Sequence, residues 1–78
     1  MKIKFETLND INSFISGIKY YDGNVLMSQG KQIVNGRSLL GMYSLELQDI
    51  IDVTIDTPNP DTETDFYNFI KKWEVQTS

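Results

Sequence analysis

The segment from Ile50 to Ile55 limits the fold most, because it is the strongest strand signal in the chain. It is rich in β-branched residues, and Ile51, Val53 and Ile55 fall on one side of an extended backbone. Asp52 and Thr54 occupy alternate positions, so the predicted strand has one apolar and one polar face. Such a strand predicts a sheet that is covered on one face and open to water on the other.

Three further segments predict strands of the same sheet. Residues 2–6 alternate polar and apolar side chains, which is typical of a half-buried strand. Residues 24–28 and 32–35 predict two short strands. The glycine-centred link at residues 29–31 between them is compatible with a hairpin.

Three segments have apolar residues at helical spacing, and each predicts a helix. The first has Thr7 as its predicted N-cap, and its apolar stripe consists of Leu8, Ile11, Phe14, Ile15 and Ile18. A short helix is predicted over residues 38–45, with Ser38 at its N-cap. The last begins at Pro60, and its buried stripe consists of Phe66, Phe69, Ile70 and Trp73.

The predicted order of elements is therefore β-α-β-β-α-β-α. We expect an α+β fold, an open-faced β-sandwich in which a four-stranded, mainly antiparallel sheet carries three helices on one face. With 78 residues there is room for a single domain, spanning residues 1–78.

Charge and missing residue types exclude several functions. Eleven acidic against seven basic residues give a net charge of −4, which argues against binding to nucleic acid or an anionic membrane. The chain has no cysteine and no histidine, so disulfides, the usual zinc sites and a Ser-His-Asp triad are excluded. We expect a cytoplasmic protein that is not an enzyme and has no metal or cofactor, since the chain also lacks a secretory signal and a membrane-spanning run.

The segment Val34–Leu45 resembles a known family. Its sequence is Val-Asn-Gly-Arg-Ser-Leu-Leu-Gly-Met-Tyr-Ser-Leu. It is similar to the region around the regulatory serine of the histidine-containing phosphocarrier protein (HPr) family of the phosphotransferase system. Residues 52–55 also resemble the family's acidic-apolar-Thr-apolar fourth strand, and residues 29–31 its hairpin turn. The predicted order of elements is that of HPr, so the resemblance implies the HPr fold.

The family's phosphoacceptor loop is missing from this chain. In the family, a Gly-Ile-His-Ala-Arg-Pro type loop follows the first strand, and its histidine passes a phosphoryl group from enzyme I to sugar-specific transport proteins. Here residues 5–10 run from strand to helix almost without a loop, and they contain no histidine, arginine or proline. The resemblance therefore implies a relative that cannot carry phosphohistidine.

Ser38 matches the position that the family's ATP-dependent kinase/phosphorylase modifies. A phosphate at a helix N-terminus meets unpaired backbone N–H groups, and Arg37 is a candidate for a charge-assisted contact to it. The alternative is that Ser38 is only an N-cap, a role that serine fills routinely.

Leu39, Leu40 and Tyr43 lie where the family presents an apolar patch to its partners. If they are exposed beside Ser38, they form a protein-binding surface together with Arg37. The alternative is that some of them pack under the sheet.

The leading prediction is a non-catalytic, HPr-like accessory or regulatory protein. It would bind other proteins, such as an HPr kinase/phosphorylase or a regulator, through residues 38–43. The alternative is a structural or assembly module that has kept the fold, has no role in the phosphotransferase system and associates with itself through the open sheet face.

One further motif favours a plain structural role. Residues 61–65 resemble the first ligands of a calcium loop, but Phe66 stands where the turn glycine is required and no glutamate follows at the twelfth position. We therefore interpret this acidic run as the charged first turn of the last helix.

Overall fold

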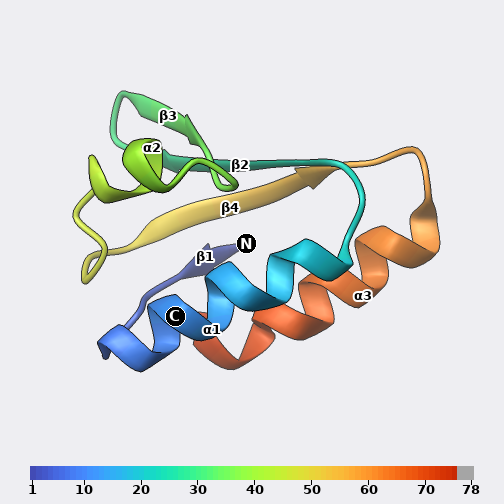
Figure 1. The fold of residues 1–78 in the computed structure, drawn as a ribbon, viewed down its shortest axis with the longest axis horizontal. Helices are drawn as coiled ribbons and strands as arrows, with labels where there is room; N and C mark the ends of the chain where they lie inside the picture. Colours follow the sequence, from blue (N-terminus) through green and yellow to red (C-terminus); the bar gives the residue numbers. More distant parts are fainter. Residues whose placement is uncertain (76–78) are drawn as a thin grey trace.

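The computed structural model describes residues 1–75, and the last three residues of the predicted domain lie outside this range. Its helices and strands follow in the predicted order, with two short 3-10 helices, η1 and η2, added (Figure 1). The elements are β1 (Lys2–Ile3), α1 (Leu8–Gly17), η1 (Ile18–Tyr20), β2 (Asn24–Gln29), β3 (Gln32–Asn35), α2 (Leu39–Tyr43), β4 (Ile51–Asp56), α3 (Pro60–Ile70) and η2 (Lys71–Trp73). The predicted α+β architecture is confirmed.

The four strands form one antiparallel sheet in the order β1-β4-β2-β3. The two central strands are β4 and β2, which are paired from Asn24 with Asp56 to Ser28 with Asp52. Helices α1 and α3 lie side by side under the sheet, and α2 lies close to β3 (Figure 1). The opposite face of the sheet remains open, as the alternation of residues 50–55 predicts.

A two-residue turn joins β2 to β3. Gly30 has a φ of +59°, which is the left-handed region, and Lys31 does not. A glycine at the first central position is typical of a type II′ turn, whose twist matches that of the flanking strands. The hairpin predicted at residues 29–31 is therefore confirmed.

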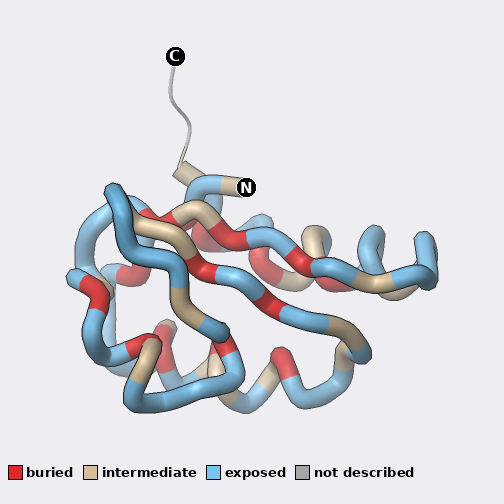
Figure 2. The backbone as a smooth tube through the Cα atoms, turned by 90° about the horizontal axis from the view of Figure 1, so that it is seen from above, coloured by how far each residue is buried: buried red, intermediate tan, exposed pale blue. Residues whose placement is uncertain are grey.

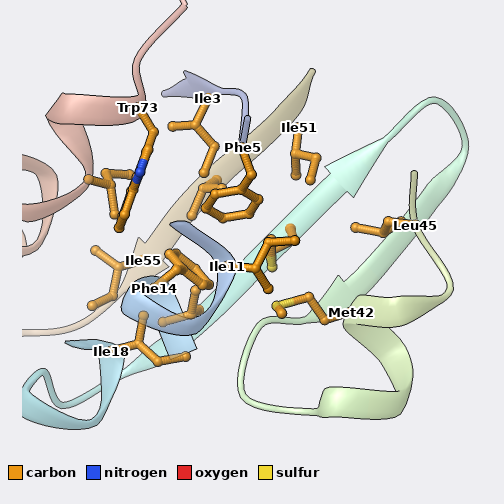
Figure 3. Packing of buried hydrophobic residues seen from close by; sticks show 14 of the residues in the cluster. Ile3, Phe5, Ile11, Phe14, Ile18, Met42, Leu45, Ile51, Ile55 and Trp73 are labelled. Atoms are coloured by element: carbon orange, nitrogen blue, oxygen red, sulfur yellow. The ribbon is translucent and has the colours of Figure 1, made fainter. Parts of the chain in front are cut away.

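One hydrophobic cluster fills the space between the sheet and the helices. All three helices contribute to it, with Phe66 from α3 and, as Figure 3 shows, Phe14 from α1 and Met42 from α2. Buried and exposed positions alternate along the central strands (Figure 2), and Ile51, Val53 and Ile55 of β4 are all buried. Within residues 1–75 no polar or charged side chain is buried, so the core provides packing and no chemistry.

The structure corrects two predictions at the start of the chain. The first strand covers only Lys2–Ile3 instead of residues 2–6, although Phe5 is still buried. The strand ends early because the residue that Lys4 would face, Ile50, lies outside β4. A capping box then starts α1, in which Asp10 N donates to Thr7 Oγ1 at 3.1 Å and Thr7 N donates to Asp10 Oδ2 at 3.2 Å. Leu8 is not part of the buried stripe and is 74% exposed, since it lies on the margin of the stripe at the first residue of the helix.

Helices α1 and α3 approach closely at Gly17, the last residue of α1. The φ of Gly17 is −74° and its ψ is −35°, so its backbone is ordinary helix. A Cβ atom at this position would lie 2.1 Å from Cζ of Phe69 in α3, well inside contact distance. Phe69 itself is only half-buried, although the sequence predicts it in the buried stripe.

Candidate functional site

Ser38 caps α2, as predicted. Its backbone is extended, with a φ of −96°, and Gly41 N donates to Ser38 Oγ at 3.3 Å. Met42 N donates to the Ser38 carbonyl at 2.9 Å, which closes the first helical turn. The Ser38 side chain is exposed, so the hydroxyl that caps the helix is also open to solvent.

Three apolar side chains project from α2 beside this hydroxyl. Leu39 is 52% exposed, Leu40 is 88% exposed and Tyr43 is 56% exposed. The inward-facing positions belong to Met42 and Leu45, which are buried in the core (Figure 3). Of the two alternatives for Leu39, Leu40 and Tyr43, the structure shows the exposed one. We call Ser38, Leu39, Leu40 and Tyr43 the α2 surface.

Arg37 does not contact Ser38 in the structure. Its Nε donates to the Gly23 carbonyl at 3.1 Å, its Nη1 to the Ile18 carbonyl at 2.9 Å, and its Nη2 to the Tyr21 carbonyl. The guanidinium therefore closes the end of η1 and the turn that leads to β2. Sequence reasoning missed this role because the acceptors are 14 to 19 residues away and no local pattern connects them to Arg37.

A groove lies between the end of α1 and the start of α2. Its volume is about 300 Å³, and it is lined by Ile15, Ile18, Lys19, Gly36, Arg37 and Leu39. Leu39 thus belongs both to this groove and to the α2 surface. The floor is apolar, and the two charged residues that line it are cations.

The segment that contains the α2 surface is positively charged, although the whole chain is negatively charged. Residues 23–45 contain Lys31 and Arg37 and no acidic residue, although the chain carries a net charge of −4. Asp22 and Glu46 flank this segment, but the two charged residues that line the groove beside Leu39 are Lys19 and Arg37. This surface therefore suits an apolar ligand group next to a negative charge.

A second hollow lies where β1 leads into α1. It has a volume of about 480 Å³ and is lined by Lys4, Glu6, Asp10, Lys72, Trp73, Glu74 and Val75. The pKa of Asp10 is lowered chiefly because the Glu6 backbone N–H donates to its carboxylate, at 3.1 Å. Lys72 Nζ lies over the Trp73 ring, 4.7 Å from its centroid. Asp10 and Lys72 thus already have partners, and the lining residues include no nucleophile paired with a base.

Within residues 1–75, no group of three or more His, Cys, Asp or Glu residues is placed to hold a metal ion. The acidic residues 61–65 lie in the first turns of α3, as predicted. None of the helices in the described range is long and apolar enough to cross a membrane.

Comparisons with protein-family models, with curated proteins and with solved structures found no match to this chain.

Proposed function

We propose that this chain is a non-catalytic protein-binding domain of the cytoplasm, related to the HPr family, that acts as an accessory or regulatory protein. The observation that carries the proposal is the exposure of Leu39, Leu40 and Tyr43 beside the hydroxyl of Ser38. Aromatic and large aliphatic side chains on one short helix are typical anchors of protein interfaces. The proposed relationship rests on the resemblance of residues 34–45 and on the order of the elements.

The surroundings of the α2 surface favour an acidic partner. An apolar side chain of the partner would enter the groove beside Leu39, and a neighbouring carboxylate would lie near Lys19. Cations at the rim of an interface mainly speed association and select against basic partners, while the apolar contacts supply most of the affinity.

The binding proposal is tested with one double variant and one control. Leu40→Ser/Tyr43→Ser removes two of the three exposed anchors, and Leu8→Ser removes a similarly exposed leucine from α1. A partner is captured with the wild-type chain, purified, and titrated against each protein by calorimetry. We expect binding at least about tenfold weaker for the double variant and unchanged for the control. Equal affinities for all three proteins would contradict the proposal.

Regulation at Ser38 requires a separate experiment. The protein is incubated with ATP and an HPr kinase/phosphorylase, and phosphate is located by mass spectrometry. We expect phosphate on Ser38 and none on the Ser38→Ala variant, with Ser44, the exposed C-cap residue of α2, as an internal control. Absence of phosphate from Ser38 would leave the residue with its capping role alone.

A further inference from the structure

The two edges of the sheet differ in whether another segment covers their outer backbone groups. At the β1 edge, Lys4 N donates to the Trp73 carbonyl at 3.0 Å and Val75 N donates to the Lys2 carbonyl at 2.9 Å. Residues 73–75 therefore cover β1 along its outer side. At the other edge, β3 pairs with β2 alone, and no strand among residues 1–75 covers its outer side.

The hydrogen-bond pattern shows which groups of β3 point outward. Gly36 N donates to the Val25 carbonyl at 2.8 Å, so this pair of positions is a hydrogen-bonded one. Hydrogen-bonded and non-hydrogen-bonded pairs alternate in an antiparallel ladder. Three positions before Gly36, Ile33 therefore forms a non-hydrogen-bonded pair with Ser28 of β2. Its N–H and C=O point away from β2, as does the N–H of Asn35.

The protection of this edge is limited to the shortness of β3, which has four residues, and to Lys31 directly before it. Gln32–Asn35 itself contains no charged residue and no proline, two of the devices that keep edge strands from pairing. Ile33 is 70% exposed on the open face, diagonal to Leu26, which is 41% exposed. On the opposite face of β3, Gly41 of α2 lies against Val34, so α2 packs on the core side and leaves Ile33 uncovered.

We propose that the outer edge of β3 pairs with β3 of a second copy, antiparallel, about a two-fold axis at Ile33. Ile33 of one copy then exchanges two backbone hydrogen bonds with Ile33 of the other, and their side chains pack together on the open face. The N–H of Asn35 donates to the Lys31 carbonyl of the second copy. No charged residue faces a like charge in this register, because Lys31 lies opposite Asn35. The two sheets become one continuous sheet.

The test is the oligomeric state of the full chain, measured by sedimentation equilibrium from low micromolar concentration to roughly 1 mM. We expect a reversible monomer–dimer equilibrium in the wild type. Ile33→Lys places a charge on each side of the axis and should weaken dimerisation at least about tenfold. Ile33→Val keeps a β-branched side chain and should dimerise like the wild type. Leu8→Lys changes an equally exposed leucine on α1 and should also leave the dimer intact.

Amide hydrogen exchange gives a second, local readout. The Ile33 and Asn35 amides should become protected as concentration rises, while the Ser28 amide, which lies within the sheet, should be protected at every concentration. A chain that remains monomeric to about 1 mM would overturn the proposal. So would a dimer that Ile33→Lys leaves intact, or one that forms without added protection at Ile33. Circular dichroism confirms that each variant is folded.

Discussion

Substituting Gly17 by alanine sets two opposing effects against each other. Alanine is favoured over glycine in a helix by about 1 kcal/mol, and the backbone at this position is already helical. The new Cβ, however, would lie 2.1 Å from Cζ, 2.6 Å from Cε1 and 2.8 Å from Cε2 of Phe69. The Phe69 ring must move before the alanine can be accommodated.

Moving the Phe69 ring disturbs its aromatic contacts. The ring stacks on Tyr21 at 5.6 Å between centroids and meets Trp73 edge-on at 5.4 Å. Overpacking of this kind costs about 1–3 kcal/mol, and each aromatic pair contributes roughly 0.5–1.5 kcal/mol. The steric cost exceeds the gain in helix propensity, so we expect a net loss of about 1–2 kcal/mol in the free energy of unfolding. For a domain of this size the melting temperature should fall by roughly 5–15 °C.

The assay is urea unfolding of four proteins that form a double-mutant cycle: wild type, Gly17→Ala, Phe69→Leu and the double variant. In the Phe69→Leu background the ring is absent, so Gly17→Ala should be neutral or stabilising by up to about 1 kcal/mol. If Gly17→Ala stabilises the wild type, or costs the same in both backgrounds, contact with the ring is not what requires glycine here.

Three further predictions concern the hydrogen bonds around the sites. Ser38→Ala should lower the free energy of unfolding by about 1 kcal/mol in urea titrations, and Ser38→Asp should restore most of it, because aspartate also caps helices. Arg37→Ala removes the donors to three carbonyls and should cost about 1–2 kcal/mol, with faster amide exchange around residues 18–23 as its local sign. Equal exchange rates in Arg37→Ala and the wild type would contradict this role. The lowered pKa of Asp10 stabilises the fold above the ordinary value of 3.8, and this contribution disappears as the pH falls through the pKa of the folded state. The stability difference between wild type and Asp10→Asn, measured in urea at a series of pH values, should therefore shrink below about pH 3.8, and a constant difference would refute this cause.

Local patterns were sufficient to predict most elements. The bounds of β3 agree with the prediction because a glycine turn followed by a short run with two β-branched residues defines a hairpin without help from distant residues. Thr7, Ser38 and Pro60 mark the starts of the three α-helices for the same reason. The bounds of β4 are shifted by one residue relative to the prediction, since Ile50 N is held by Asp49 Oδ1 at 2.8 Å and stays outside the ladder.

Features that depend on distant residues could not be predicted. Leu8 fits the apolar stripe of α1, but the sequence does not show that the sheet fails to cover the first residue of that helix. The Arg37 side chain is directed by carbonyls of another element, so the hydrogen bonds that it makes in the structure could not be predicted from its neighbours in the sequence. For the α2 surface, the sequence left burial and exposure open, because five helical residues are too few to define one face.

The Arg37 guanidinium binds carbonyls in residues 18–23, and Arg37 lies next to the start of α2 in the chain. These carbonyls and an anion at the start of α2 would therefore compete for the same cation. An anion on Ser38 that drew this guanidinium toward itself would take it from the carbonyls of Ile18, Tyr21 and Gly23. Thermodynamic reciprocity then applies: a partner that tightens the turn weakens the hold of Arg37 on the anion, and the anion weakens the turn by the same factor. Charge added at the start of α2 would thus lower the stability of the turn after α1 without any movement of the core.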